Sequence, residues 1–168
     1  MPLSMYRASV PVFKQMLRSL DTILDKAAAY ATARKIEPSA LLHARLAPDM
    51  FHLIRQVQIA SDQAKGVAAR LAGQEPPKFE DSEASFVDLK ARIAKTIAFL
   101  DGLQPAQIDG SEDREISLPV GGQTMKFKGA DYLLGFGMPN FYFHITTAYA
   151  LLRHNGLEVG KRDFLGVR

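Results

Sequence analysis

The sequence predicts an all-α protein, a bundle of four long helices with a small β-hairpin inserted before the last helix. Four segments repeat apolar residues at the spacing of an amphipathic helix. One short region instead alternates apolar and polar residues on both sides of a Gly-Gly pair, which is typical of a hairpin. Because 168 residues is about the length of one domain, we expect residues 1–168 to form a single domain.

The first helix is predicted over residues 4–33. Its apolar face is formed by Phe13, Leu17, Leu20, Leu24, Ala27 and Ala31. Pro11 cannot donate a backbone hydrogen bond, so we expect either a kink there or a helix start just before it. After the break at Glu37-Pro38, a short turn of helix is expected over residues 40–46.

The second helix is predicted to open at Pro48 and to run to about residue 72, where Gly73 ends it. A linker follows at residues 74–78. The third helix is predicted over residues 82–100. Four carboxylates lie near its start, where negative charge favours the helix dipole: Glu80, Asp81, Glu83 and Asp88.

The hairpin is predicted over residues 115–120 and 124–128, and it should pack on the helices because an isolated hairpin is only marginally stable in water. The fourth helix is predicted from Pro139 to Asn155, with Gly156 as its stop and a short tail after it. The connection before this helix, of roughly 40 residues, is long for a bundle, and long connections are often functional.

The composition excludes several classes of site. The sequence has no cysteine, so it can form no disulfide, thiolate zinc site, iron–sulfur cluster or cysteine nucleophile. Metal or general-base chemistry that uses imidazole depends on four histidines, His43, His52, His144 and His154. No nucleophile motif, phosphate-binding loop or dinucleotide fingerprint is present.

Charge and hydropathy indicate the environment. The net charge of +3 is small and the basic residues are spread out, so we expect no nucleic-acid partner. The sequence has no apolar run of about 18 residues and no signal-peptide core at its start. We therefore expect a cytoplasmic protein that does not span a membrane.

The fourth helix carries the candidate ligand site. Helical spacing places His144 beside the core face, and it gathers Tyr142, Tyr149 and Arg153 on one flank. Tyrosine can bury its ring and present its hydroxyl, and arginine can bind an anion at two points. Together with Asn140, these side chains form the predicted ligand-binding set. The alternative is a structural role, with His144 a hydrogen-bonded buried histidine and the aromatic rings part of the core or of an interface.

A metal site on the fourth helix is not supported by spacing. His144 and His154 are ten positions apart, which corresponds to about 15 Å of helical rise, too far for both to ligate one ion. A helix-borne pair needs a spacing of three or four residues, and the residue four before His154 is Ala150.

Several runs of the sequence resemble a known family. They are Ala44–Met50, Gln56–Asp62, Ala91–Leu100, Pro139–His144 and Leu151–Gly156, followed by the tail Gly160–Gly166. The chain is similar over almost its whole length to an uncharacterised family, a domain of unknown function within the DinB/YfiT-like superfamily. The resemblance implies a DinB-like up-down-down-up four-helix bundle that is often a homodimer.

The resemblance also implies what a metal site would require. Many members of the superfamily bind a divalent metal through one histidine of the second helix and two histidines spaced by four on the fourth, and some transfer thiols. Here His154 falls at the end of that motif and His52 could stand in for the ligand of the second helix, but the partner position of His154 holds Ala150. If a metal is bound at all, the resemblance makes His52 and His154 the candidate ligands. We therefore favour a protein that binds a small ligand without a complete metal site or cofactor. The alternatives are a metal-dependent transferase or hydrolase and a dimeric interaction protein.

Overall fold

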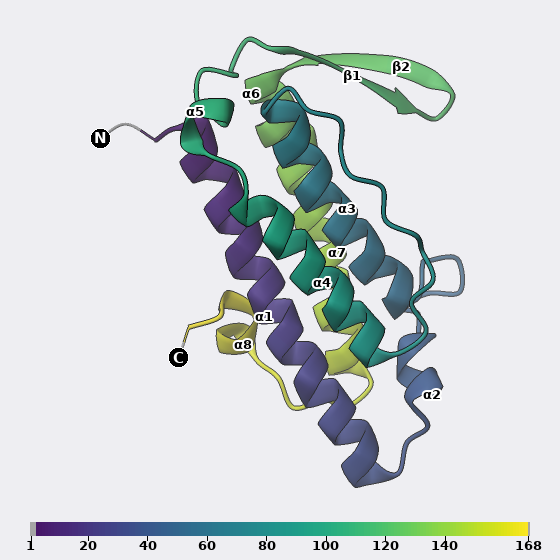
Figure 1. Ribbon diagram of the computed structural model, residues 1–168. Helices are drawn as coiled ribbons and strands as arrows, with labels where there is room; N and C mark the ends of the chain where they lie inside the picture. Colours follow the sequence, from purple (N-terminus) through teal and green to yellow (C-terminus); the bar gives the residue numbers. More distant parts are fainter. Residues whose placement is uncertain (1–2, 168) are drawn as a thin grey trace.

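The computed structural model describes residues 3–167, which are mostly helical with one two-stranded hairpin (Figure 1). Its long helices, which lie side by side, are α1 (Met5–Arg34), α3 (Leu53–Leu71), α4 (Phe86–Asp101) and α7 (Met138–His154). The shorter elements are α2 (Pro38–Leu42), α5 (Pro105–Ile108), β1 (Glu115–Val120), β2 (Gln123–Lys128), α6 (Gly129–Asp131), the π-helix η1 (Tyr132–Gly137) and α8 (Lys161–Leu165).

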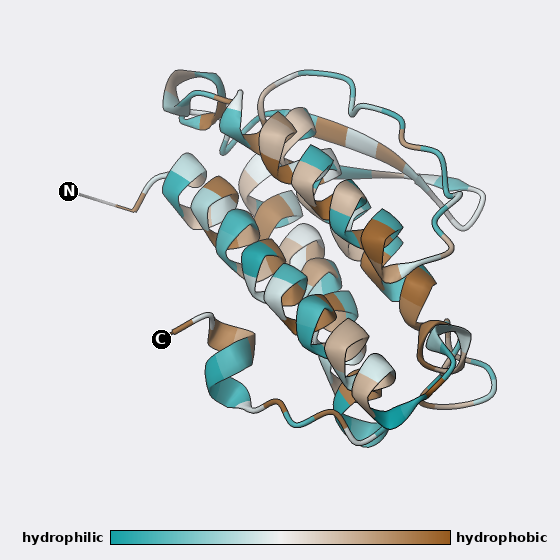
Figure 2. Ribbon diagram, turned by 60° about the horizontal axis from the view of Figure 1, so that its bottom comes forward, coloured by the Kyte–Doolittle hydropathy of each residue, from teal (hydrophilic) through white to brown (hydrophobic). Residues whose placement is uncertain are grey.

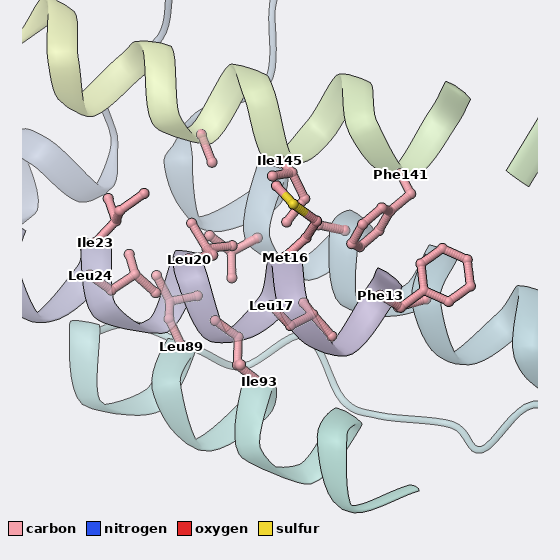
Figure 3. Packing of buried hydrophobic residues seen from close by; sticks show 14 of the residues in the cluster. Phe13, Met16, Leu17, Leu20, Ile23, Leu24, Leu89, Ile93, Phe141 and Ile145 are labelled. Carbon is pink, nitrogen blue, oxygen red and sulfur yellow. The ribbon is translucent and has the colours of Figure 1, made fainter. Parts of the chain in front are cut away.

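The core lies between the long helices. From α1, Leu17 and Leu20 pack near Ile93 of α4 and Ile145 of α7, and all four side chains are buried (Figure 3). The helices mix hydrophilic and hydrophobic residues along their length, as amphipathic helices do (Figure 2). This burial of apolar surface is the main favourable term that holds the helices together.

Helix α1 passes through Pro11 without ending. It starts at Met5, where the Ser4 hydroxyl accepts a hydrogen bond from the Arg7 amide at 3.3 Å. The predicted start near residue 4 is therefore confirmed, and a helix start just before Pro11 is wrong. The helix ends at Lys35, which adopts a left-handed conformation with a φ of 54°.

Helix α3 starts later than predicted. Residues 48–52 form a loop, and the predicted opening at Pro48 is wrong. The Arg45 guanidinium donates to the Met50 carbonyl at 2.6 Å, which holds the loop in a non-helical path. Nδ1 of His52 then accepts from the Arg55 amide at 3.4 Å and caps α3. Helix α2 likewise covers Pro38–Leu42 instead of residues 40–46.

Helix α4 also starts later than predicted, at Phe86 instead of Ser82. The Ser85 hydroxyl accepts from the Asp88 amide at 3.1 Å, and the Asp88 carboxylate accepts from the Ser85 hydroxyl and the Ala84 amide. Of the four carboxylates expected to favour the helix dipole, only Asp88 lies in the first turn. The other three precede the helix in an extended segment.

The fourth long helix begins well before Pro139, since α6, η1 and α7 follow one another from Gly129 to His154. Pro139 has no amide hydrogen and its ring crowds the carbonyl four residues earlier, so the wider π-helical turn just before it relieves that crowding. Gly137 brings this turn close to α3, because a Cβ there would lie 2.6 Å from the Val67 side chain.

The hairpin is confirmed. Strands β1 and β2 are antiparallel, with Glu115 opposite Lys128, and Gly121 and Gly122 both adopt the positive φ that a tight hairpin turn needs. Ile116 and Leu118 are buried, so the hairpin packs on the body of the protein as expected. No helix within residues 3–167 is long and apolar enough to cross a membrane.

Candidate functional site

His144 is buried on α7 and makes one defined hydrogen bond. Its Nδ1 lies 2.7 Å from Oε1 of Gln56 on α3, and Nε2 of Gln56 donates to the Phe51 carbonyl at 3.0 Å. Because the Gln56 amide nitrogen is already used, its oxygen accepts and Nδ1 of His144 carries the proton. Nε2 of His144 is then an acceptor.

The surroundings keep His144 neutral. Burial, and to a smaller extent the positive charge of Arg55, lower its pKa from 6.5 to about 4. The side chain is only 9% exposed, and the edge of the Phe143 ring lies against it with ring centroids 5.1 Å apart. A neutral imidazole at this place cannot act as a cation, but it can accept one hydrogen bond.

A shallow apolar hollow lies on the outer side of α7, and one of its lining residues, Phe143, packs against the buried His144. The hollow has a volume of about 410 Å³ and is lined by Leu46, Tyr142, Phe143, Thr146, Thr147 and Ala150. Phe143 and Leu46 are 54% and 40% exposed, and the two apolar side chains lie together in this hollow. The Thr147 hydroxyl donates to the Phe143 carbonyl, so it is satisfied within the helix. We call this surface the α7 hollow.

The structure separates the predicted ligand-binding set into two groups. The first group lies in the first half of α7: Tyr142 lines the α7 hollow, His144 is buried toward Gln56 and does not line the hollow, and the half-buried Asn140 lies one helical turn before His144. Tyr149 and Arg153 instead donate to backbone carbonyls of the C-terminal segment, Val159 and Leu157 respectively, at 3.4 Å each. The Tyr149 ring also packs edge-on against Phe164. The second group therefore holds the C-terminal segment in place.

The other histidines do not fit a three-ligand metal centre. His52 caps α3 and its ring packs against that of the exposed His43, with centroids 5.4 Å apart. Burial lowers the pKa of His52, and the charges of His43 and of two arginines add to this effect. His154 lies exposed in the last turn of α7. Within residues 3–167, no three His, Asp or Glu side chains come together as a group that could hold a metal ion.

Sequence reasoning missed a second cluster, centred on Arg92 of α4. This arginine side chain is 1% exposed and is paired with three carboxylates, of Asp62, Asp81 and Glu83. The available signal was an arginine directly beside Ile93 in the apolar stripe of the third predicted helix, nine residues after the acidic run that ends at Glu83. Arginine in such a place needs partners, because an unpaired buried charge is costly.

Comparison with known proteins gives the family. A family model described as "Domain of unknown function (DUF1993)" matches residues 5–165. A crystal structure of a DinB family member protein from Shewanella denitrificans is 45% identical, with a TM-score of 0.92, over 97% of this chain and 92% of that one. No curated protein matches the chain. The chain therefore belongs to the family described as a domain of unknown function (DUF1993), and it is similar in sequence and fold to a DinB family member.

Proposed function

We propose that the protein binds a small, uncharged and largely apolar molecule in the α7 hollow, without a metal ion. The observation that carries the proposal is the hollow itself, in which Leu46, Tyr142 and Phe143 are exposed together on one face. Burial of apolar ligand surface there contributes roughly 25 cal/mol per Å².

His144 supports this site from the core side, since its ring packs against Phe143 but does not itself line the hollow. Held by Gln56, it stays uncharged, so it adds no charge that would favour an anion over a neutral ligand. Of the five predicted ligand-binding residues, we assign Asn140, Tyr142 and His144 to this site. We assign Tyr149 and Arg153 to holding the C-terminal segment.

The test is a titration with the neutral fluorescent probe N-phenyl-1-naphthylamine. We expect saturable binding to the natural protein, and a loss of affinity of about ten-fold or more in Thr146→Lys, which places a charge in the hollow. The matched control is Thr32→Lys, another exposed threonine, on α1. Equal affinity in all three proteins contradicts the proposal.

A metal-dependent transferase or hydrolase is the weaker alternative, because His52 and His154 lack a third ligand among the residues described. Elemental analysis of protein purified without chelators tests it. A stoichiometric divalent metal that is lost in His52→Ala would favour the enzyme over the metal-free binding protein.

A homodimer that uses the same face is the second candidate function. The exposed apolar side chains of Leu46 and Phe143, which line the same hollow, favour it, because contiguous exposed apolar surface often marks a protein interface. Sedimentation velocity distinguishes the two functions. A natural dimer that Thr146→Lys converts to a monomer indicates an interface, whereas a monomer in both proteins favours the small-molecule site.

We further propose the up-down-down-up order of the superfamily for the long helices, and a cytoplasmic location. The order is supported by the path of residues 72–85, which run back along α3 before α4 starts, so that α3 and α4 point the same way (Figure 1). Tagging both termini and imaging the protein in cells tests the location.

A further inference from the structure

Residues 74–85, which we call the strap, lie along α3 and α4 in an extended conformation (Figure 1). Backbone bonds do not hold the strap along its length. Gln74 donates to the Ala69 carbonyl at one end, and between residues 75 and 84 the described chain has no backbone-to-backbone hydrogen bond. The strap is therefore held on the helices by contacts that involve side chains. In this respect it resembles a peptide bound in a groove.

Arg92 of α4 is the main attachment. Its guanidinium donates to the Glu83 carboxylate at 2.9 Å and to the Glu80 carbonyl at 3.0 Å, and it pairs with Asp81 at 3.0 Å. The same group donates to Asp62 of α3 at 2.8 Å. Burial alone lowers the pKa of Arg92, but its bonds to Glu83 and the charge of Asp62 outweigh burial and raise it. The guanidinium is thus always charged.

Helix α3 supplies two more cations to the strap. Arg55 donates to the Asp81 carboxylate at 2.6 Å, and Lys65, which is buried, donates to the Pro77 carbonyl at 2.7 Å. Gln58 donates to Glu83 at 2.8 Å. Without the strap, the cations Arg55, Lys65 and Arg92 would keep only one of the carboxylates that now pair with them, that of Asp62.

An aromatic side chain completes the attachment. The ring of Phe79 lies within cation–π distance of Lys95, Lys65 and Arg92, at 4.2, 4.7 and 5.7 Å. Three buried side-chain atoms have no partner among the described residues, and two of them belong to this region. They are Nε of Arg92 and Oγ of Ser61, which shares one face of α3 with Gln58 and Lys65, three and four positions away. Part of this polar surface is therefore unsatisfied, which is costly for buried groups.

We propose that this surface, formed by Gln58, Ser61, Lys65 and Arg92 with Arg55 at its edge, is a binding site for an extended acidic peptide, and that the strap occupies it in cis. The occupant itself indicates the ligand chemistry. Its two anchoring carboxylates, of Asp81 and Glu83, are two residues apart, and in an extended chain such residues point to the same side. A partner segment must displace a strap whose effective concentration is on the order of millimolar.

The first experiment tests whether the strap can leave. The natural chain has no cysteine, so Ser61→Cys introduces one thiol between the helix positions that hold the strap. We expect its reaction with Ellman's reagent to be about ten-fold faster when Asp81→Asn and Glu83→Gln are added, because two charge-assisted bonds are weakened. A Ser9→Cys thiol, buried in α1, is the control and should not change. Equal acceleration of both thiols, or of neither, overturns the proposal.

The second experiment tests the site in trans. A fluorescein-labelled peptide with the sequence of residues 78–85, KFEDSEAS, is titrated by anisotropy against the natural protein and the Asp81→Asn, Glu83→Gln variant. We expect at least ten-fold tighter binding to the variant, whose cis segment competes less. A peptide with amides in place of its three carboxylates is the control. Equal binding of the two peptides overturns the proposal.

A third substitution assigns the binding to the cations. Arg92→Met or Lys65→Met, added to the variant, should each reduce peptide affinity by about ten-fold or more. The helical circular dichroism signal is measured in the same samples, and Lys65→Met serves if Arg92→Met does not fold. Unchanged affinity in a folded cation variant contradicts the proposal. Binding at the α7 hollow is measured separately, so either site can fail without the other.

Discussion

Acidification should destabilise the fold through His144. The pH is lowered from about 7 to about 5. At the lower pH, the imidazole of His144 is mostly protonated in the unfolded chain but mostly neutral in the folded one. Burial holds its folded pKa at about 4, compared with the ordinary value of 6.5. Because the folded pKa is lowered, the stability that comes from neutral His144 is fully present above pH 6.5 and is lost as the pH falls toward 4.

The size of the effect follows from these two values. At about pH 5 the proton binds the unfolded histidine strongly and the folded one little, so His144 costs about 2 kcal/mol of stability relative to pH 7. The depressed carboxylate pKa values, such as that of Asp88, which its hydrogen bond from Ser85 lowers, contribute below this range. The window from pH 5 to 7 therefore isolates the histidines.

The assay is urea unfolding at closely spaced pH values, for the natural protein and for His144→Asn. The substitution lowers the free energy of unfolding at every pH, so the two proteins are compared only by how much that free energy changes between pH 7 and 5. We expect the natural protein to lose about 2 kcal/mol more than His144→Asn between pH 7 and 5. His52, whose pKa burial also lowers, is present in both proteins and cancels. If the free energy of unfolding falls by the same amount with pH in both proteins, His144 is not the source of the pH dependence.

Two positions give further predictions that thermal or urea unfolding can check. Gly137→Ala should destabilise by about 1–3 kcal/mol because its Cβ would overlap the Val67 side chain, whereas Gly135→Ala, whose Cβ would meet nothing within 4 Å, should not destabilise. A larger loss of stability in Gly135→Ala than in Gly137→Ala would contradict the close contact between η1 and α3. Ser85→Ala should cost about 1 kcal/mol by removing the cap of α4, and it should raise the pKa of Asp88, measurable by NMR titration. An unchanged Asp88 titration is inconsistent with that cap.

The long helices and the hairpin could be predicted because their signals are local. Periodic apolar residues such as Leu17 and Leu20 define the helix faces, and Gly121-Gly122 defines the turn. The helix starts were less accurate, since they depend on which side chain caps the first turn. His52 caps α3 where Pro48 was expected to open it, and the π-helical turn before Pro139 left no sequence signal.

The site could be predicted only in part. Helical spacing correctly placed His144 at the core side of α7, but its partner Gln56 lies 88 residues away, and no pattern links the two. The carboxylates at residues 80–83 had a sufficient local explanation in the helix dipole, which concealed their long-range pairing with Arg92. Contacts between distant segments are decided by packing, and a single sequence does not encode them in any local period.

Ligand binding in the α7 hollow can be tested by NMR, by mapping the chemical shifts of the backbone and of the imidazoles while N-phenyl-1-naphthylamine is added to isotope-labelled protein. A site in the α7 hollow predicts that the largest shifts fall on residues 142–150, on Leu46 and on the ring of His144, without added metal. Shifts confined to other helices, or no saturable shift at all, would contradict the claim.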